Sequence, residues 1–578
     1  MKKIITLSLT CILLVIFGVA LIFTLYNKKI IKPPFSYTGN ATFNNNTLTI
    51  TESGTYTLSG YLENGLIHVN AKKADVILEL DDLEIANTDQ ACIYVQKANS
   101  VTIVLSDGST NVLTSGDETL WTDLDPISER KSESEMWGGN QKSNKDIPRH
   151  NSNSELSNAD NDDRPPFPPD MFEDENDNDD SSDEEDLKDE EKAVIYCKDD
   201  LTIDGSGTLI INGYIKNGIQ CADNLIVDNG CFYIKALGTG ILGRDSLTIN
   251  GGSMNISSHK DALKSTNDDE DKGWVVINDG DITLASAKNG VHAESSLTIN
   301  GGKIDVVQSY EGLEGRFITI NDGTVDIVSS DDGINAYGGS SNFGGPGGFD
   351  RHDNPDWENR PDGQSRPNGQ MNTDKQSNSD GSDKPDRQLP PDRQDAQERP
   401  DKPFGPGMGG RNNIDNKTTL PINKSEVSAT YESREDSEGN PLSYLVINGG
   451  TITVDAQGDG LDSNGDLVIY GGSIIVQGPS NNGNGALDSG TESGGKLLIH
   501  GGTIIAIGAS GMAETFEEGS SQAAIRNIDN EFKTGDIITI KNTAGNELTS
   551  LTAKTSGNCI VFSHPDLNTD QNIIITVQ

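Results

Sequence analysis

Apolar and polar residues alternate along most of this chain in a phrase that returns about every 22 residues. The phrase reads L-x-I-x-G-G-x-I-x-V, and a short Asp-Gly-apolar-Asp segment follows it. Alternation with period two indicates β-strands, and a repeat of roughly 20–30 residues is typical of a solenoid in which one repeat makes one turn. Clear copies begin at Leu201, Leu225, Leu247, Val275, Leu297, Ile318, Leu445, Leu467 and Leu497.

The repeat and the breaks in its composition divide the chain. Gly-Gly in each unit predicts a tight corner, and two stretches rich in Ser, Asn, Asp, Glu, Gly and Pro interrupt the repeat and are expected to be disordered loops. The segments are an N-terminal apolar segment (1–35), β-rich first turns with a cap (36–116), an acidic loop (117–192), regular turns (193–337), a Gly/Pro/Asp-rich loop (338–443), further turns (444–533) and a β tail that covers the open end (534–578).

The composition limits the partners of the chain. Hydrophobic residues make up only 33% of it, which suits the narrow axial core of a solenoid better than a large globular core. The formal net charge is −46. Such an acidic chain is not expected to bind nucleic acid, because phosphate contacts need Lys and Arg. The charge instead favours cations, or anionic ligands reached through cations.

The N-terminus indicates export. Met-Lys-Lys precedes an apolar run, residues 4–26, which is long enough to span a bilayer as a helix. An uncleaved signal anchor and a cleaved signal peptide are both open interpretations, so the protein is expected to be membrane-anchored and facing outward, or secreted. The cysteines lack the spacing of a zinc site and read as small buried residues. A bond between Cys221 and Cys231 on adjacent turns is the alternative in an oxidising compartment.

Acidic residues recur at two phases of the repeat. Equivalent positions of stacked turns lie about 4.8 Å apart, so each phase forms a column in space. We define the first column as the residues fourteen positions after the opening apolar residue: Thr239, Asp261, Asn289, Glu311, Asp332 and Asp459. The second column lies three positions further on and holds Leu242, Lys264, His292, Glu314, Asn335, Asp462 and, in a stretched turn, Asp488.

Carboxylates stacked this closely repel one another unless a cation lies between them. Calcium accepts six to eight oxygen ligands in flexible geometry, whereas zinc prefers Cys and His. The predicted calcium ligands are Glu311, Glu314, Asp331, Asp332, Asn335, Asp459, Asp462 and Asp488. Asp-Gly as simple turn chemistry is the alternative, but it does not explain the second acidic residue. Asp261 and Lys264 are interpreted as an ion pair, and His292 as a surface residue.

Four stretches resemble clostridial carbohydrate-binding proteins. They are Cys197-Lys-Asp-Asp-Leu-Thr-Ile-Asp-Gly-Ser-Gly-Thr-Leu, Lys260-Asp-Ala-Leu-Lys-Ser-Thr-Asn-Asp, Glu311-Gly-Leu-Glu-Gly and Gly458-Asp-Gly-Leu-Asp-Ser-Asn-Gly. The resemblance covers residues 36–116, 193–337 and 443–578. It implies an all-β protein, a right-handed parallel β-helix with long disordered loop insertions and a small β-rich C-terminal tail. It also implies calcium bound along the helix and affinity for plant cell-wall polysaccharide, including acidic galacturonan.

The same resemblance extends in architecture to pectate lyases, which use calcium carboxylates and a basic residue, often Lys. We therefore weigh three functions: a non-catalytic, calcium-dependent binder of galacturonan or a cellulosic polysaccharide, a polysaccharide lyase with Lys264 as its base, and a structural or adhesive surface protein. Lys264 lies two turns from Glu311, about 10 Å by turn spacing, which is far for a shared site. The binding function is therefore favoured, with the membrane as a second partner through the N-terminal helix. The oligomeric state stays open.

Overall fold

A computed structural model describes residues 32–124, 192–337, 431, 433–435, 439–567 and 573–578. The expected N-terminal membrane segment lies outside these residues, and so do most of the two expected loops, residues 125–191 and 338–430. Among the residues that are described, no helix is both long and apolar enough to cross a membrane.

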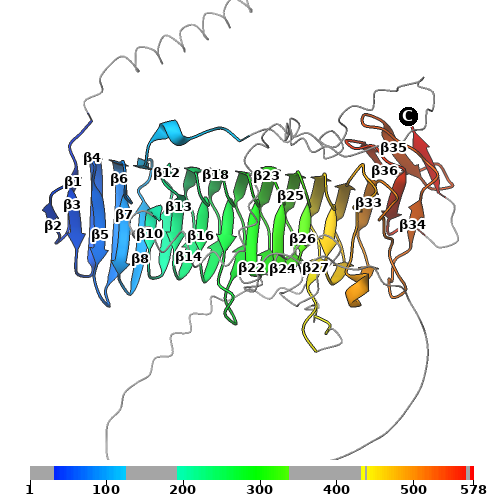
Figure 1. Ribbon diagram of the computed structural model, residues 1–578, viewed down its shortest axis with the longest axis horizontal. Helices are drawn as coiled ribbons and strands as arrows, with labels where there is room; N and C mark the ends of the chain where they lie inside the picture. The colour runs from blue at the N-terminus through cyan, green and yellow to red at the C-terminus, as the bar shows by residue number, and fades with distance from the viewer. Residues whose placement is uncertain (1–31, 125–191, 338–430, 432, 436–438, 568–572) are drawn as a thin grey trace, which may run out of the picture. The chain divides into compact units, whose positions relative to one another are not determined.

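Within the described ranges, thirty-five strands belong to one hydrogen-bonded sheet that coils into a parallel β-helix (Figure 1). In the regular turns, each strand pairs in parallel with the equivalent strand of the next turn. Helical structure in the described ranges is limited to short 3-10 turns such as η1 (Glu118–Leu120) and η5 (Thr491–Ser493). The predicted all-β solenoid is therefore confirmed.

Three stacks of strands form the regular turns. The first stack contains β7 (Ile93–Lys97), β10 (Ala193–Cys197), β13 (Asn217–Cys221), β16 (Ile241–Gly243), β19 (Leu263–Ser265), β22 (Val291–Ile299), β24 (Leu313–Ile320), β26 (Ile334–Ala336) and β29 (Leu461–Ser463). The second contains β8 (Ser100–Leu105), β11 (Leu201–Gly205), β14 (Asn224–Val227), β17 (Ser246–Ile249), β20 (Trp274–Ile277), β27 (Tyr444–Ile447), β30 (Asp466–Ile469) and β32 (Leu497–Ile499). The ends of β22 and β24 continue into this second stack.

The third stack contains β9 (Thr110–Ser115), β12 (Thr208–Gly213), β15 (Cys231–Ala236), β18 (Ser253–Ser258), β21 (Asp281–Ser286), β23 (Lys303–Ser309), β25 (Thr324–Ser329), β28 (Thr451–Ala456), β31 (Ser473–Gln477) and β33 (Thr503–Gly508). The N-terminal turns are built from β1 (Ser36–Tyr37), β2 (Thr42–Asn44), β3 (Thr47–Ile50), β4 (Gly54–Glu63), β5 (Leu66–Asn70) and β6 (Asp75–Asn87). Antiparallel pairs β1–β4 and β2–β3 lie at this end of the helix.

The core is a set of apolar ladders along the axis. In the first stack, Leu263, Val291, Leu313, Ile334 and Leu461 are register partners in successive turns and are fully buried. Alternation turns the side chains of the following residues away from this axial core. Each turn thus buries the same kind of side chain while its outward positions vary freely.

The Gly-Gly corners behave as the repeat predicts. Gly302 has a φ of +84°, and a Cβ at this position would lie 2.9 Å from the backbone N and O of Gly280 in the preceding turn. Only glycine combines that backbone conformation with that close an approach. The corner therefore fixes where the chain passes from the second stack to the third.

An asparagine ladder runs outside the same corner. Each side-chain amide donates to the side-chain oxygen of the preceding turn, at 2.6–2.8 Å. The ladder starts from the carboxylate of Asp228 and continues through Asn250, Asn278, Asn300, Asn321 and Asn448.

The turns on either side of residues 338–443 are direct neighbours. β24 pairs with β27, and β26 pairs with β29, so that Ile334 is the register partner of Leu461. The composition places residues 431–443 in the second loop, but part of this stretch contacts the helix. Arg434 Nε donates to Oδ2 of the buried Asp466 at 2.8 Å, and the Tyr431 hydroxyl donates to the same carboxylate.

The start of the first expected loop also contacts the helix. The composition places residues 117–124 in the acidic loop, but the Trp121 ring lies 4.8 Å from the His259 ring, centroid to centroid. His259 Nε2 donates to the carbonyl oxygen of Thr122 at 2.8 Å. An aromatic contact and a hydrogen bond thus hold this stretch, which composition alone does not reveal.

The C-terminal segment closes the helix with antiparallel strands. Its strands are β34 (Ala524–Asn527), β35 (Ile537–Lys541), β36 (Glu547–Thr552), β37 (Cys559–Ser563) and β38 (Ile574–Val577). β37 pairs with both β33 and β34, and β35 pairs with β36 and β38 in a small separate sheet. A second apolar cluster that includes Phe532 and Phe562 packs beneath them.

The cysteines do not form the pair considered above. Cys221 is the register partner of Cys197, whereas Cys231 aligns with Thr208 and Ser253 on another stack. Both buried thiols, Cys197 and Cys221, donate to the carbonyl oxygen of Asp199, at 2.9 and 3.0 Å. The cysteines of the described ranges are free, and burial, with the neighbouring Cys221, raises the pKa of the Cys197 thiol.

Candidate cation-binding column

The first stack of strands positions both columns. First-column residues lie at the bend just before each strand, and second-column residues are the outward positions of the strands themselves. Lys264, His292, Glu314, Asn335 and Asp462 are register partners in successive turns. The apolar residue between the two phases points into the core, so both polar side chains lie on the same outer face.

Three first-column carboxylates accept a backbone N–H from the next turn. Oδ1 of Asp332 accepts the backbone N–H of Asp459 at 2.6 Å, and Oδ1 of Asp459 accepts that of Gly485. Asp261 accepts the N–H of Asn289 in the same way at 3.3 Å. A hydrogen bond to the backbone of the next turn therefore accounts for one oxygen of each of these three carboxylates. It does not account for the other.

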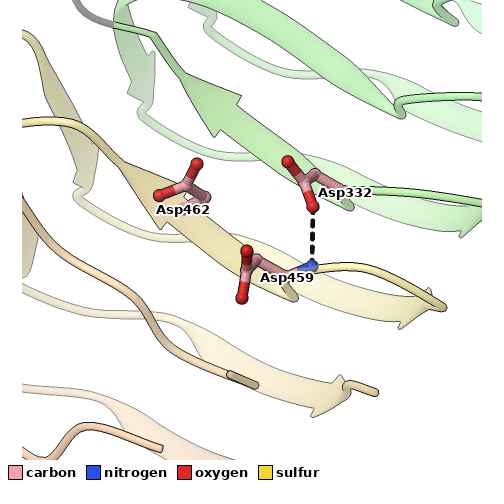
Figure 2. Close-up of side chains that lie close together, drawn as sticks. All are labelled: Asp332, Asp459 and Asp462. Atoms are coloured by element: carbon pink, nitrogen blue, oxygen red, sulfur yellow. Dashed lines mark hydrogen bonds between the residues drawn. The ribbon is translucent and has the colours of Figure 1, made fainter. Parts of the chain in front are cut away.

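Both columns are mainly acidic from Glu311 to Glu514, and we call these turns the acidic stretch. Three carboxylates converge in the middle of it. Asp332, Asp459 and Asp462 each offer one oxygen within 4.8 Å of the others, and each side chain is half-buried. Figure 2 shows that they come from two neighbouring turns, with the hydrogen bond from Asp459 N to Asp332 between the turns. Three carboxylate oxygens at this separation could serve as part of the ligand set of a hard cation.

The surroundings disfavour the charged forms of these carboxylates when no cation is bound. Burial, with the neighbouring carboxylates of Asp331 and Asp459, raises the pKa of Asp332 to about 8. Burial, with Asp488 and Asp331, raises the pKa of Asp459 to about 6. Both groups are thus held close to like charges in a partly desolvated place. A bound cation would remove this cost.

Buried oxygen atoms next to the three carboxylates also lack donors. Oε2 of Glu311 and Oδ1 of Asn335 are buried and have no hydrogen-bond partner among the described residues. The Asn335 amide donates weakly to Oε1 of Glu311, at 3.5 Å. Burial, with the carboxylates of Glu314 and Asp332, raises the pKa of Glu311 well above its usual range. Unpaired buried acceptors are costly, so the turns of Glu311 and Asp332 also offer oxygens to a cation.

Towards the N-terminal turns, the second column carries basic side chains in place of carboxylates. Lys264 Nζ lies 3.3 Å from Oδ2 of Asp261, and both side chains are almost fully buried, which confirms the predicted ion pair. Burial alone would raise the pKa of Asp261, but Lys264, with His292 and Lys288, outweighs it and lowers that pKa. Here the protein supplies its own cation.

His292 is not the surface residue that the sequence suggested. It is only 3% exposed, its Nδ1 contacts Oε2 of Glu314, and the Tyr337 ring stacks on it at 6.2 Å. Burial alone would lower the pKa of His292, but Glu314 and Glu294 raise it to about 10. Asn289 also donates to Glu314. Of the predicted ligands, Glu314 is therefore turned towards His292 and Asn289, while Asp332, Asp459 and Asp462 converge.

Two residues that the sequence reasoning missed extend the acidic stretch. Glu514 accepts the Ser489 hydroxyl at 2.7 Å, and burial, with Asp488 nearby, raises its pKa. A signal was present, since Gly511-Met-Ala-Glu repeats the order of Gly485-Ala-Leu-Asp. The Tyr310 hydroxyl is hydrogen-bonded to Asp331, and burial, with this carboxylate, raises the pKa of Tyr310.

Comparisons with known proteins match part of the chain. A family model described as "Carbohydrate-binding domain-containing protein" matches residues 44–126 and 171–349. A curated protein of the same description from Acetivibrio thermocellus is 30% identical over 188 residues, which are 32% of this chain and 44% of that protein. The chain therefore aligns with less than half of that relative. A solved polysaccharide lyase-like protein from C. thermocellum, a gadolinium derivative, is 24% identical, with a TM-score of 0.33 over 50% of this chain and 86% of that one.

Proposed function

We propose that this protein binds acidic polysaccharide through calcium held by Asp332, Asp459 and Asp462. The observation that carries the proposal is the convergence of these three carboxylates, whose ligand oxygens lie within 4.8 Å of one another. They belong to two turns that are adjacent in space although residues 338–443 separate them in sequence. The fold therefore brings these carboxylates together at a cost that a bound cation offsets.

The donor set favours calcium. All three side chains offer oxygen, and further buried acceptors are Oδ1 of Asn335, in the turn of Asp332, and Oε2 of Glu311, in the preceding turn. Calcium takes six to eight oxygen ligands with flexible geometry, whereas zinc prefers sulfur and nitrogen. Asp331 and Asp488 lie along the same acidic stretch. Glu314 contributes less, because His292 and Asn289 already hold its carboxylate.

The ligand follows from charge and from the matched family. A chain with a net charge of −46 repels a polyuronate, so an acidic sugar needs a cation as a bridge. Half-buried ligands leave coordination positions open for a sugar carboxylate or hydroxyl. The matched family model is described as carbohydrate-binding. We further propose that the protein acts outside the cell, because residues 4–26 are apolar and long enough to serve as an export signal or anchor.

The proposed activity is binding without turnover. A lyase needs a base that reaches the proton next to the uronate carboxyl group. Lys264, the residue considered for this role, is 3% exposed and paired with Asp261 at 3.3 Å. A buried, paired ammonium has neither the access nor the free electron pair that a base requires.

Galacturonan binding with and without calcium tests the proposal. We expect calorimetric binding in calcium, loss of binding in a chelator, and recovery when calcium is restored. Asp462→Ala should weaken binding at least tenfold, whereas Asp305→Ala, on the outer side of β23, should leave it unchanged. Binding that is indifferent to calcium and to Asp462→Ala would contradict the proposal. Ultraviolet absorbance in the same samples reports the unsaturated product of β-elimination, and an increase with time would establish a lyase instead.

A further inference from the structure

Lys264 occupies a place in the second column where later turns carry oxygen ligands. It is the register partner of His292, which aligns with Glu314, Asn335 and Asp462 in turn. Its ammonium lies 3.3 Å from Oδ2 of Asp261, the first-column carboxylate of the same turn. The pair Asp261 and Lys264 thus has the same backbone placement as the pair Asp459 and Asp462, three residues apart at one bend.

The two placements differ in what neutralises the first-column carboxylate. Asp261 is 1% exposed, so a charge there without a counter-ion would be strongly destabilising. A lysine ammonium is a compact positive charge that can be held beside a carboxylate at a bend. In the turn of Asp459 the corresponding residue is Asp462, which adds a second negative charge.

We propose that Lys264 is a built-in counter-ion that makes the turns of Asp261 and Asn289 independent of calcium and sets the N-terminal limit of the cation-binding stretch. The inference rests on the proposed function, since it takes the later acidic turns as calcium sites. Beyond that function, the inference identifies Lys264 as the residue that determines which turns of the helix need a metal ion. If Lys264 served only for packing, its replacement would change stability without changing the response to calcium.

Hydrogen exchange on the full chain, followed peptide by peptide with and without calcium, measures this limit. In the natural protein, calcium should slow exchange at least several-fold in residues 311–337 and 445–490 and leave residues 255–293 unchanged. Lys264→Asn removes the charge and supplies an oxygen ligand, so residues 255–293 should then become calcium-sensitive. Lys264→Arg keeps the charge and should stay calcium-insensitive there. Lys272→Asn removes a lysine from the surface pair with Asp245 and should behave like the natural protein.

Calcium sensitivity of residues 255–293 in the natural protein would overturn the inference, and so would a folded Lys264→Asn protein that stays insensitive there. If Lys264→Asn does not fold even in calcium, the double variant Asp261→Asn/Lys264→Met, which removes both charges, decides the question. The counter-ion role expects it to fold and to remain insensitive in this region, and unfolding of the double variant contradicts that role. Failure of the proposed function looks different, because then no region of the natural protein responds to calcium, while Lys264→Asn still tests the role of the lysine.

Discussion

The two columns contain buried carboxylates along two stretches of the helix, and the charge of these carboxylates is compensated differently in each stretch. In the turn of Asp261, the buried carboxylate is neutralised from within the chain by Lys264, and in the turn of Asn289 the side chain of His292 contacts Glu314 at the start of the acidic stretch. From Glu311 to Glu514 the column is acidic, and Asp332, Asp459 and Asp462 converge. The backbone is the same in both stretches: a bend, a short strand of the first stack and an in-register partner above and below.

The difference shows that, in a solenoid, the inward apolar residues provide the core while the outward residues can change their chemistry independently. Leu263 and Val291 in the neutralised stretch are as fully buried as Ile334 and Leu461 in the acidic stretch. Because the inward ladder is continuous, the outward residue three positions after each bend can be lysine, histidine or aspartate without a change of register. Under the proposed function, the contrast in charge, and not a contrast in fold, decides where a cation binds.

Removing the converging carboxylates should have the largest effect on this contrast. We expect calcium to raise the melting temperature of the natural protein, because it binds the folded column and not the unfolded chain. Calcium at a hundredfold excess over its dissociation constant stabilises by about 2.7 kcal/mol. Asp332→Asn/Asp459→Asn should abolish most of this shift, since it removes two of the three charges that hold the ion. Differential scanning calorimetry with and without calcium measures it.

The matched control for this double variant removes two carboxylates from outer strand positions. Asp281→Asn/Asp305→Asn changes the net charge equally but lies on β21 and β23, away from the column. It should keep the full calcium shift. A calcium shift that survives in Asp332→Asn/Asp459→Asn would show that the ion binds elsewhere.

Much of this arrangement could be predicted from the sequence, because the repeat specifies register. Alignment on the opening apolar residue predicts that the turn of Ile334 stacks on the turn of Leu461 despite more than a hundred intervening residues, and the two are register partners. The glycine corners and the ion pair of Asp261 with Lys264 follow from the same alignment. The alignment also places Cys197 and Cys221 at one phase, four residues before Leu201 and Leu225, so their proximity was predictable.

What the sequence did not reveal depends on contacts between turns. The burial of His292 comes from the Tyr337 ring, two turns on, and from Glu314 in the next turn. A pattern read one turn at a time cannot show such coverage. Glu514 was missed because the last turns are stretched and lose the regular phase. The packing of Trp121 on His259 was hidden by the polar composition of the sequence around it.

The pH dependence of stability should have opposite signs in the two stretches. Asp332 and Asp459, with pKa values of about 8 and 6 without metal, lie above the value of about 3.9 for an unfolded Asp. The metal-free folded protein therefore keeps protons that the unfolded chain releases, so this contribution is fully present below about pH 4 and is lost as the pH rises through 6 and 8. The pKa of Asp261 is lowered, so its contribution is present above the unfolded value and is lost in acid.

Calcium bound as proposed would displace protons from the acidic stretch, so its affinity should fall roughly tenfold per pH unit below the pKa of a displaced proton. The difference in melting temperature between calcium-loaded and metal-free protein should therefore widen from pH 5 to pH 9. Thermal unfolding of dialysed protein across this range measures it. A calcium shift that is constant with pH would show that Asp332 and Asp459 are not ligands. In Asp332→Asn/Asp459→Asn the dependence should flatten.

The smallest expected effect concerns the asparagine ladder, which passes both stretches on another side of the helix. Asn278 and Asn321 make equivalent bonds to the preceding turn, at 2.7 Å each, beside turns of different charge. Asn278→Ala and Asn321→Ala should each reduce the free energy of unfolding by about 1 kcal/mol, the usual net value of a hydrogen bond. Since the ladder touches neither column, both losses should be equal with and without calcium. Chemical denaturation in both conditions measures them. If calcium changed the loss of unfolding free energy in Asn321→Ala only, the metal would stabilise the whole cross-section of the turns that bind it. The difference between the two stretches would then extend beyond the columns.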